Sequence, residues 1–138
     1  MPELSVKVIR LSLIYLVLGF TLGALLLVNK ATNIDPQIWR LLPVHIEIIV
    51  FGWVMHLVMG VAYWSFPRFF EMPKRGNALF NWSMIILLNV GIWMTIFGDL
   101  AFSSNMLPFI GRILEAIGFV GFFVLIWQRT RSPQARHD

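Results

Sequence analysis

The hydrophobic pattern of the chain consists of four long apolar runs, separated by short segments that contain proline, asparagine or charged residues. The runs cover residues 11–28, 41–66, 79–98 and 106–127. Each is about as long as the ~20 residues that a helix needs to cross the hydrocarbon layer of a bilayer. The pattern therefore predicts an all-α integral membrane protein with four transmembrane helices.

The predicted helices form one four-helix bundle, a single transmembrane domain that occupies residues 1–138. We expect the helices over about 10–29, 41–66, 79–99 and 107–128, followed by a polar tail at 130–138. Composition supports this interpretation, because 58% of the residues are hydrophobic and only 13% are charged, whereas a soluble domain carries about 25% charge. A soluble globular domain and a disordered chain are both excluded.

Lysine and arginine are distributed unequally between the two ends of the predicted bundle. Three lie at one end, namely Lys30, Arg40 and Arg112. Eight lie at the other, namely Lys7, Arg10, Arg68, Lys74, Arg75, Arg129, Arg131 and Arg136. Because cytoplasmic loops carry the excess of positive charge, we expect both termini to be cytoplasmic. The net charge of +4 then reflects topology and lipid contact rather than nucleic-acid binding, and we expect a multi-pass protein of a prokaryotic cytoplasmic (inner) membrane.

A few polar residues interrupt the apolar runs, and each is a candidate functional group because an ionisable side chain inside a bilayer costs about 2.5–3.5 kcal/mol. The chain has no cysteine, which excludes disulfides, thiolate metal sites and c-type haem attachment. Asn81 and Asn89 are expected to hold helices together. The ionisable candidates are His45, Glu47, His56, Asp99, Arg112 and Glu115.

The two histidines of the second run are predicted to share one helix face. His45 and His56 are eleven residues apart, which places them about 20° out of alignment and roughly 16 Å apart along an α-helix. Gly52 between them leaves a notch in which a flat group can approach the backbone. An imidazole, a small residue and an apolar wall are what a haem requires. Copper competes, since Met55 and Met59 flank His56, and a histidine that only packs is the remaining alternative.

Two arginines are placed to neutralise haem propionates at the outer end of the bundle. Arg40 and Arg112 both suit bidentate pairing with carboxylates. Alternatively, Arg40 extends toward the aqueous phase and Arg112 pairs with Glu115 at i+3. Glu47 lies about 200° around the helix from His45. We expect it to bond to a neighbouring helix as a protonated carboxyl, with a quinol or proton site as the alternative.

The second run resembles one helix of a known family. Arg40-Leu-Leu-Pro-Val-His45, Phe51-Gly52-Trp53 and Gly60-Val-Ala-Tyr-Trp-Ser-Phe-Pro-Arg68 are similar to the second helix of the catalytic subunit of haem–copper oxidases, closest to cbb-type cytochrome oxidases and nitric oxide reductases. The resemblance covers about 30 residues and implies that His45 is an axial ligand of a low-spin haem b. The family's later helices, with the second haem ligand and the copper-binding histidines, have no counterpart here, so an oxygen-reducing centre is not expected in this chain alone.

One chain thus offers one histidine at each of two depths, whereas a six-coordinate haem needs two axial ligands. A homodimer that shares one or two haems b through His45 and His56 satisfies this requirement. A methionine, an open coordination position or a ligand from another subunit are the alternatives. We predict a membrane-bound b-type haem protein for electron transfer, with quinol or respiratory-chain subunits as partners. A non-redox accessory or assembly subunit of a respiratory complex and a haem-based sensor of nitric oxide or oxygen remain alternatives, and whether the protein is an enzyme is left open.

Overall fold

The computed structural model describes residues 1–66, 78–101 and 106–129. Within these ranges the regular elements are all helical, and four helices are long and apolar enough to cross a membrane. The second of these runs without a break from Pro36 to Ser65 through four successive elements. The elements are α1 (Glu3–Thr32), the 3₁₀-helix η1 (Pro36–Leu41), α2 (Leu42–Glu47), the π-helix η2 (Ile48–Met55), α3 (His56–Ser65), α4 (Ala78–Ala101) and α5 (Met106–Arg129).

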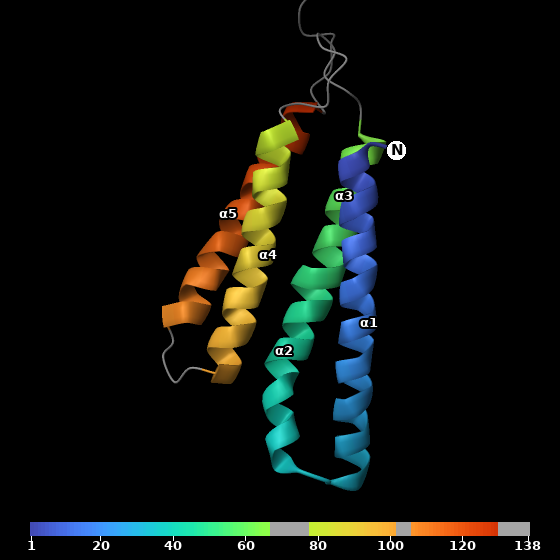
Figure 1. Cartoon of the computed structure of the whole chain (residues 1–138), viewed down its shortest axis with the longest axis vertical. Helices are drawn as coiled ribbons and strands as arrows, with labels where there is room; N and C mark the ends of the chain where they lie inside the picture. Colours follow the sequence, from blue (N-terminus) through green and yellow to red (C-terminus); the bar gives the residue numbers. More distant parts are fainter. Residues whose placement is uncertain (67–77, 102–105, 130–138) are drawn as a thin grey trace, which may run out of the picture.

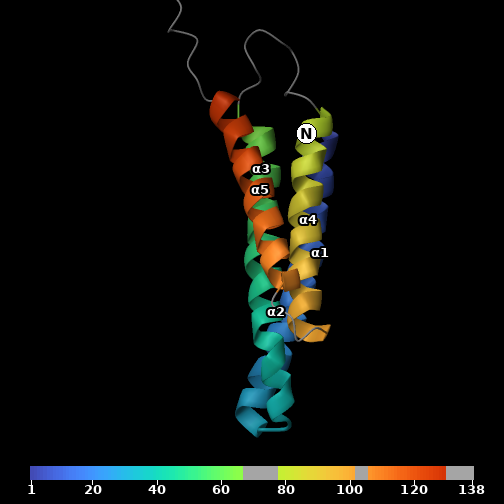
Figure 2. The ribbon, with the colours of Figure 1, turned by 90° about the vertical axis from the view of Figure 1, so that its left-hand side faces the viewer.

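The helices form two antiparallel hairpins (Figure 1). In one, α1 packs against η2 and α3, and in the other α4 and α5 pack along each other. Figure 2 shows the second hairpin in front of the first, with α4 over α1 and α5 over α3. The start of α1 and the end of α5 lie at the same end of the bundle. The predicted four-helix arrangement is confirmed, whereas the predicted polar tail and most of the predicted basic middle loop fall outside the described residues.

The first helix is longer than the predicted 10–29. It begins at Glu3. The polar first turn is stabilised by an ion pair between Glu3 and Lys7, one turn apart. It ends at Thr32, where Asn33 adopts the left-handed conformation with φ 49° and donates its backbone N–H to the Asn29 carbonyl at 2.8 Å. Asparagine is one of the few residues that adopt this conformation readily.

The turn into the second helix is built by side chains that satisfy free backbone N–H groups. The Asp35 carboxylate accepts the N–H of Gln37 at 2.8 Å, and Pro36 occupies the first helical position, where no N–H is needed. The Asn29 side chain in turn accepts the N–H of Asp35 at 3.0 Å. The helix therefore starts at residue 36, five residues before the predicted boundary.

Glycines allow the two helices of the second hairpin to touch at the backbone. A Cβ on Gly91 would lie 2.7 Å from the carbonyl oxygen of Gly111, and a Cβ on Gly118 would lie 3.0 Å from the Leu88 nitrogen. Small residues permit such close approach, which is a common packing mode of membrane helices. Gly91 and Gly118 thus allow α4 and α5 to pack closely together.

The bundle has a thin buried core and an apolar exterior. Val8, Leu88 and Ile92 are almost fully buried. Phe20 and Leu27 on α1, by contrast, are 66% and 67% exposed, and large apolar side chains are exposed on every long helix. Soluble monomers rarely expose contiguous apolar surface on this scale.

Candidate functional site

His45 is held against α1 by a single hydrogen bond. Its Nδ1 lies 2.9 Å from the carbonyl oxygen of Gly19. Because a carbonyl only accepts, Nδ1 carries a hydrogen, and in the neutral imidazole the lone pair is then on Nε2. None of the described residues donates a hydrogen bond to Nε2 of His45. The ring is thus oriented by the backbone, with its basic nitrogen unengaged.

The His45 ring lies in a recess that α1 provides. A Cβ on Gly23 would be 2.8 Å from Cε1 of His45, so only glycine leaves room for the ring there. Gly19, one turn earlier, accepts the hydrogen bond and leaves space for the side chain of Ile49. Gly19 and Gly23, one helical turn apart, therefore pair α1 with the second helix.

His56 is fully buried and hydrogen-bonded at both ring nitrogens. Nδ1 donates to the carbonyl oxygen of Phe51 at 2.9 Å, and Nε2 accepts from Nδ2 of Asn89 at 2.7 Å. Asn89 also donates to the carbonyl of Ile85 at 2.9 Å and accepts the Tyr15 hydroxyl hydrogen at 2.8 Å. A continuous chain of hydrogen bonds thus connects α1, α3 and α4.

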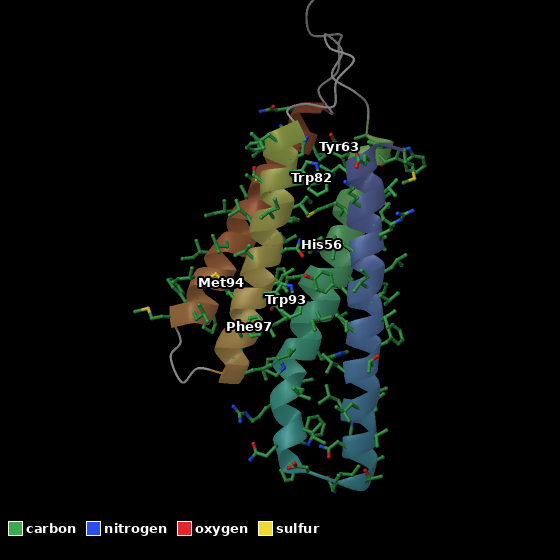
Figure 3. All side chains as sticks on the ribbon, in the orientation of Figure 1. His56, Tyr63, Trp82, Trp93, Met94 and Phe97 are labelled. Atoms are coloured by element: carbon green, nitrogen blue, oxygen red, sulfur yellow. The ribbon has the colours of Figure 1, made fainter. Side chains whose placement is uncertain are left out.

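The notch at Gly52 is filled by an aromatic ring of the protein. A Cβ on Gly52 would lie 2.6 Å from Cδ1 of Tyr15. The same ring lies 5.5 Å from His56 and 6.5 Å from Trp93, between ring centroids. Figure 3 shows His56 and Trp93 between the second helix and α4. The flat group that Gly52 admits is therefore Tyr15, and the described structure leaves Gly52 no room for a haem.

The hydrogen bonds of the two histidines of the predicted stripe lead to different helices, although the ring of Tyr15 on α1 also packs against His56. His45 bonds to α1, whereas Nε2 of His56 bonds to α4. The π-helix η2, Ile48–Met55, lies between them. Its hydrogen bonds join residues five apart, so it advances by fewer degrees per residue than an α-helix does. The 3.6-residue periodicity used for the prediction therefore does not apply across this segment.

Glu47 and Arg112 form an ion pair that joins the two hairpins. An oxygen of Glu47 contacts Nη1 of Arg112, and the same nitrogen lies 3.0 Å from Glu115 Oε2. Glu115 Oε1 accepts the hydroxyl hydrogen of Thr95 at 3.0 Å. Both carboxylates are buried, while the Arg112 side chain is 49% exposed and lies over the ring of Phe51.

These contacts agree with the interpretation that Arg112 pairs within the chain. It pairs with Glu115 at i+3 and also with Glu47, so its guanidinium is already neutralised within the chain. Glu47 faces α5 while His45 faces α1, which confirms that they lie on opposite sides of the helix. Arg40 is exposed in η1, and its proposed contact with a propionate stays a prediction.

The five predicted site residues do not converge on one place. His45 lies beside α1, Gly52 and His56 lie around Tyr15, Arg112 lies against α5's own Glu115, and Arg40 is at the end of the bundle. Among the described residues, no group of three or more His, Asp or Glu side chains is arranged to hold a metal ion.

The sequence pattern did not indicate that Tyr15 and Thr95 form hydrogen bonds between helices inside the bundle. Tyr15 lies in an uncharged apolar run, where an aromatic residue carries no signal of its own. Thr95 is also surrounded by apolar residues, and its bond to Glu115 depends on how α4 and α5 are aligned. Asn89 was recognised as a residue that holds helices together, and it does so.

Comparison with known proteins gives no relative for this chain. No protein-family model, curated protein or solved structure matches it. The resemblance of residues 40–68 to an oxidase helix therefore stays an interpretation of the sequence.

Proposed function

We propose that this is a multi-pass membrane protein that binds a b-type haem through Nε2 of His45 and carries electrons. The observation that carries the proposal is the His45 imidazole, with Nδ1 bonded to the Gly19 carbonyl and Nε2 unengaged. Metal-ligating histidines characteristically donate their other ring N–H to a carbonyl or carboxylate, which fixes the tautomer and strengthens the ligand.

Membrane insertion is supported by the apolar exterior. The four long helices each include a window with mean hydropathy of at least 1.7, of which no more than 39% is buried inside the bundle. In water this surface would drive aggregation, whereas in lipid it matches the surroundings. The excess of lysine and arginine at one end supports cytoplasmic termini, and we place the protein in a prokaryotic inner membrane.

The residues of this chain fit a haem at His45 and do not fit one at His56. Ligation by His56 would require its Nε2 to give up the buried hydrogen bond that it accepts from Asn89 at 2.7 Å. His45 needs no such change, because its hydrogen bond to Gly19 uses the other nitrogen. A bound haem would supply one-electron redox chemistry. His45 would bind its iron, and the hydrogen bond to Gly19 would orient the His45 imidazole.

A second copy of the chain supplies the second axial ligand in this proposal. Each chain has one unengaged imidazole nitrogen among its described residues, and a low-spin haem needs two. His45 is only partly buried, so it lies at the surface of the helix pair formed by α1 and the second helix. A two-fold axis beside this edge brings two His45 side chains to one group.

A second candidate function has its own supporting observation. His56, Gly52 and Arg112 all serve contacts within the bundle. If His45 does the same, the protein is a non-redox accessory subunit of a membrane complex. This candidate expects a colourless protein and normal assembly of the His45→Ala variant.

Haem binding is tested by expressing the protein with ample haem and recording a reduced-minus-oxidised spectrum and a pyridine haemochrome. We expect b-type bands, one haem per two chains, and loss of the haem in His45→Ala. His56→Ala is the matched control and should retain haem in whatever fraction folds. A haem-loaded monomer would contradict the shared ligand, and a colourless native protein would favour the accessory function.

A further inference from the structure

The π-helix η2, Ile48–Met55, lies between two polar contacts that attach the second helix to the second hairpin. Directly before it, Glu47 contacts Arg112 of α5. Directly after it, His56 accepts a hydrogen bond from Asn89 of α4 at 2.7 Å. We call these contacts the Glu47 bridge and the His56 bridge.

The two bridges are compatible with each other because of η2. Glu47 and His56 are nine residues apart, and in an α-helix they would point in opposite directions, since nine residues turn through about 900°. Bonding between residues five apart inserts one residue into the helical register, which corresponds to about 100° of rotation. The angle between the two side chains therefore falls from about 180° to about 80° across η2. Both can then reach the second hairpin, Glu47 at α5 and His56 at α4.

Contacts from outside η2 hold its eight residues in the π form. Their sequence, Ile-Ile-Val-Phe-Gly-Trp-Val-Met, contains no proline and is compatible with an α-helix. The ring of Tyr15 fills the notch at Gly52, and Nδ1 of His56 donates to the carbonyl oxygen of Phe51 at 2.9 Å. Because π-helices are rare and mostly one turn long, the form of η2 depends on these contacts and on the two bridges.

We propose that η2 is a conformational switch, which changes from the π form to the α form when the Glu47 bridge opens. The change turns the segment Pro36–Glu47 by about 100° about the helix axis relative to α3. His56 keeps its hydrogen bonds, Glu47 leaves Arg112, and His45 turns away from α1 until it lies within about 20° of the direction of His56. The switch does not depend on haem binding, so it can fail while the haem proposal holds, and the reverse.

The Glu47 bridge is the one that a group outside the bundle can reach. The Arg112 side chain is 49% exposed, whereas His56 is fully buried. Opening this bridge leaves the second hairpin intact, because Glu115 keeps its contacts with Arg112 and Thr95. The movement is therefore confined to the second helix.

Deleting one residue of η2 should lock the switch. Without Val50, Glu47 and His56 are eight residues apart, and an α-helix then turns through about 800°, which again leaves about 80° between them. Both bridges can form without a π-helix, and the variant should fold. Deletion of Val58 is the matched control, because both valines are exposed positions of one helix. No inserted residue absorbs this second deletion, so Tyr63 is turned away from its buried contacts and the folded fraction should fall sharply.

Distances between two nitroxide labels, measured by electron resonance on the full-length chain in lipid nanodiscs, test the switch. The natural chain has no cysteine, and the exposed positions Ile46, Val58 and Ile86 can each be changed to cysteine. The pair Ile86→Cys and Ile46→Cys connects α4 to the segment that turns, whereas Ile86→Cys and Val58→Cys connects α4 to α3. Because a helix is about 10–12 Å wide, a turn of about 100° moves the tip of a side chain by about 8 Å.

We expect one distance for the Ile86–Ile46 pair in the native background. Arg112→Met and Glu47→Leu open the bridge from opposite ends, and each should add a second distance, while the Ile86–Val58 pair keeps one. The second distance should disappear when Val50 is also deleted.

Circular dichroism and gel filtration identify the folded variants, and either bridge variant alone is sufficient. An unchanged Ile86–Ile46 distance in a folded bridge variant overturns the proposal. So does a second distance that persists after deletion of Val50, or a Val50 deletion that is as damaging as the Val58 deletion.

Discussion

Nδ2 of Asn89 donates a hydrogen bond to Nε2 of His56 across 2.7 Å, and this contact ties α4 to α3 inside the bundle. The same asparagine accepts the hydroxyl hydrogen of Tyr15 from α1. One amide therefore connects three helices. This arrangement satisfies both ring nitrogens of a histidine that is buried among apolar side chains.

Replacing Asn89 with leucine should destabilise the bundle by about 1–3 kcal/mol, because His56 Nε2 and the Tyr15 hydroxyl both lose a buried partner. Unfolding of the detergent-solubilised protein by a denaturing detergent measures the change. Ser83→Ala is the matched control, since the Ser83 hydroxyl bonds only to the Phe80 carbonyl of its own helix. Equal stability of the two variants would contradict the bridging role.

Gly52→Ala should lower the free energy of unfolding by about 1–3 kcal/mol, because the new methyl group overlaps the ring of Tyr15. Combining it with Tyr15→Leu, which removes the ring, should give a smaller loss than the sum of the two single losses. Val54→Ala, at an exposed position of the same helix, is the control. Additive losses in the double variant would show that the two residues do not interact.

Gly23→Ala tests how α1 orients His45. A Cβ at this position would lie 2.8 Å from Cε1 of His45, so the imidazole must turn away and its bond to Gly19 is lost. On the haem proposal, the haem content per chain should fall by at least half. Leu25→Ala, at a nearby exposed position, should leave the haem content unchanged, and an unchanged content in Gly23→Ala would separate haem binding from this contact.

Arg112→Met should destabilise the protein by about 3 kcal/mol, the lower end for a broken buried ion pair because the arginine is half exposed. Unfolding of the detergent-solubilised protein by a denaturing detergent measures the change. Adding Glu47→Gln and Glu115→Gln should recover most of the stability.

The membrane topology can be tested with single cysteines, since the natural chain has none. Lys7→Cys near the start of α1 and Gln37→Cys in η1 occupy exposed positions at opposite ends of the first hairpin. A membrane-impermeant thiol reagent should label Gln37→Cys in intact cells and Lys7→Cys only after lysis. The reverse pattern would place the termini outside.

The helix count followed from the sequence because each span is an uninterrupted apolar run. The ends of the helices did not follow as well, since the charged first turn at Glu3 and the capped turn at Asp35 extend helices beyond the apolar residues. Turn chemistry and local ion pairs decide these boundaries, and hydropathy does not measure them.

The candidate site was predictable only where it depends on local geometry. Arg112 and Glu115 are three residues apart on one α-helix, and α-helical geometry alone predicts their contact. The alignment of His45 with His56 depends on eleven residues, and the π-helix η2 changes it. Long-range partners such as Tyr15 and Asn89 require the packing of α1 on α4, which no local pattern contains.

The first hairpin extends beyond the second at the end where α1 meets η1 (Figure 1). With 30 residues in α1 and 24 in α4, the two helices differ in length by about 9 Å. The protruding end carries the polar residues Asn29, Lys30 and Asp35, and the apolar runs 11–28 and 79–98 are of similar length. On the membrane proposal, α1 and α4 therefore match one hydrocarbon thickness, and the protruding end of the first hairpin lies among the lipid headgroups.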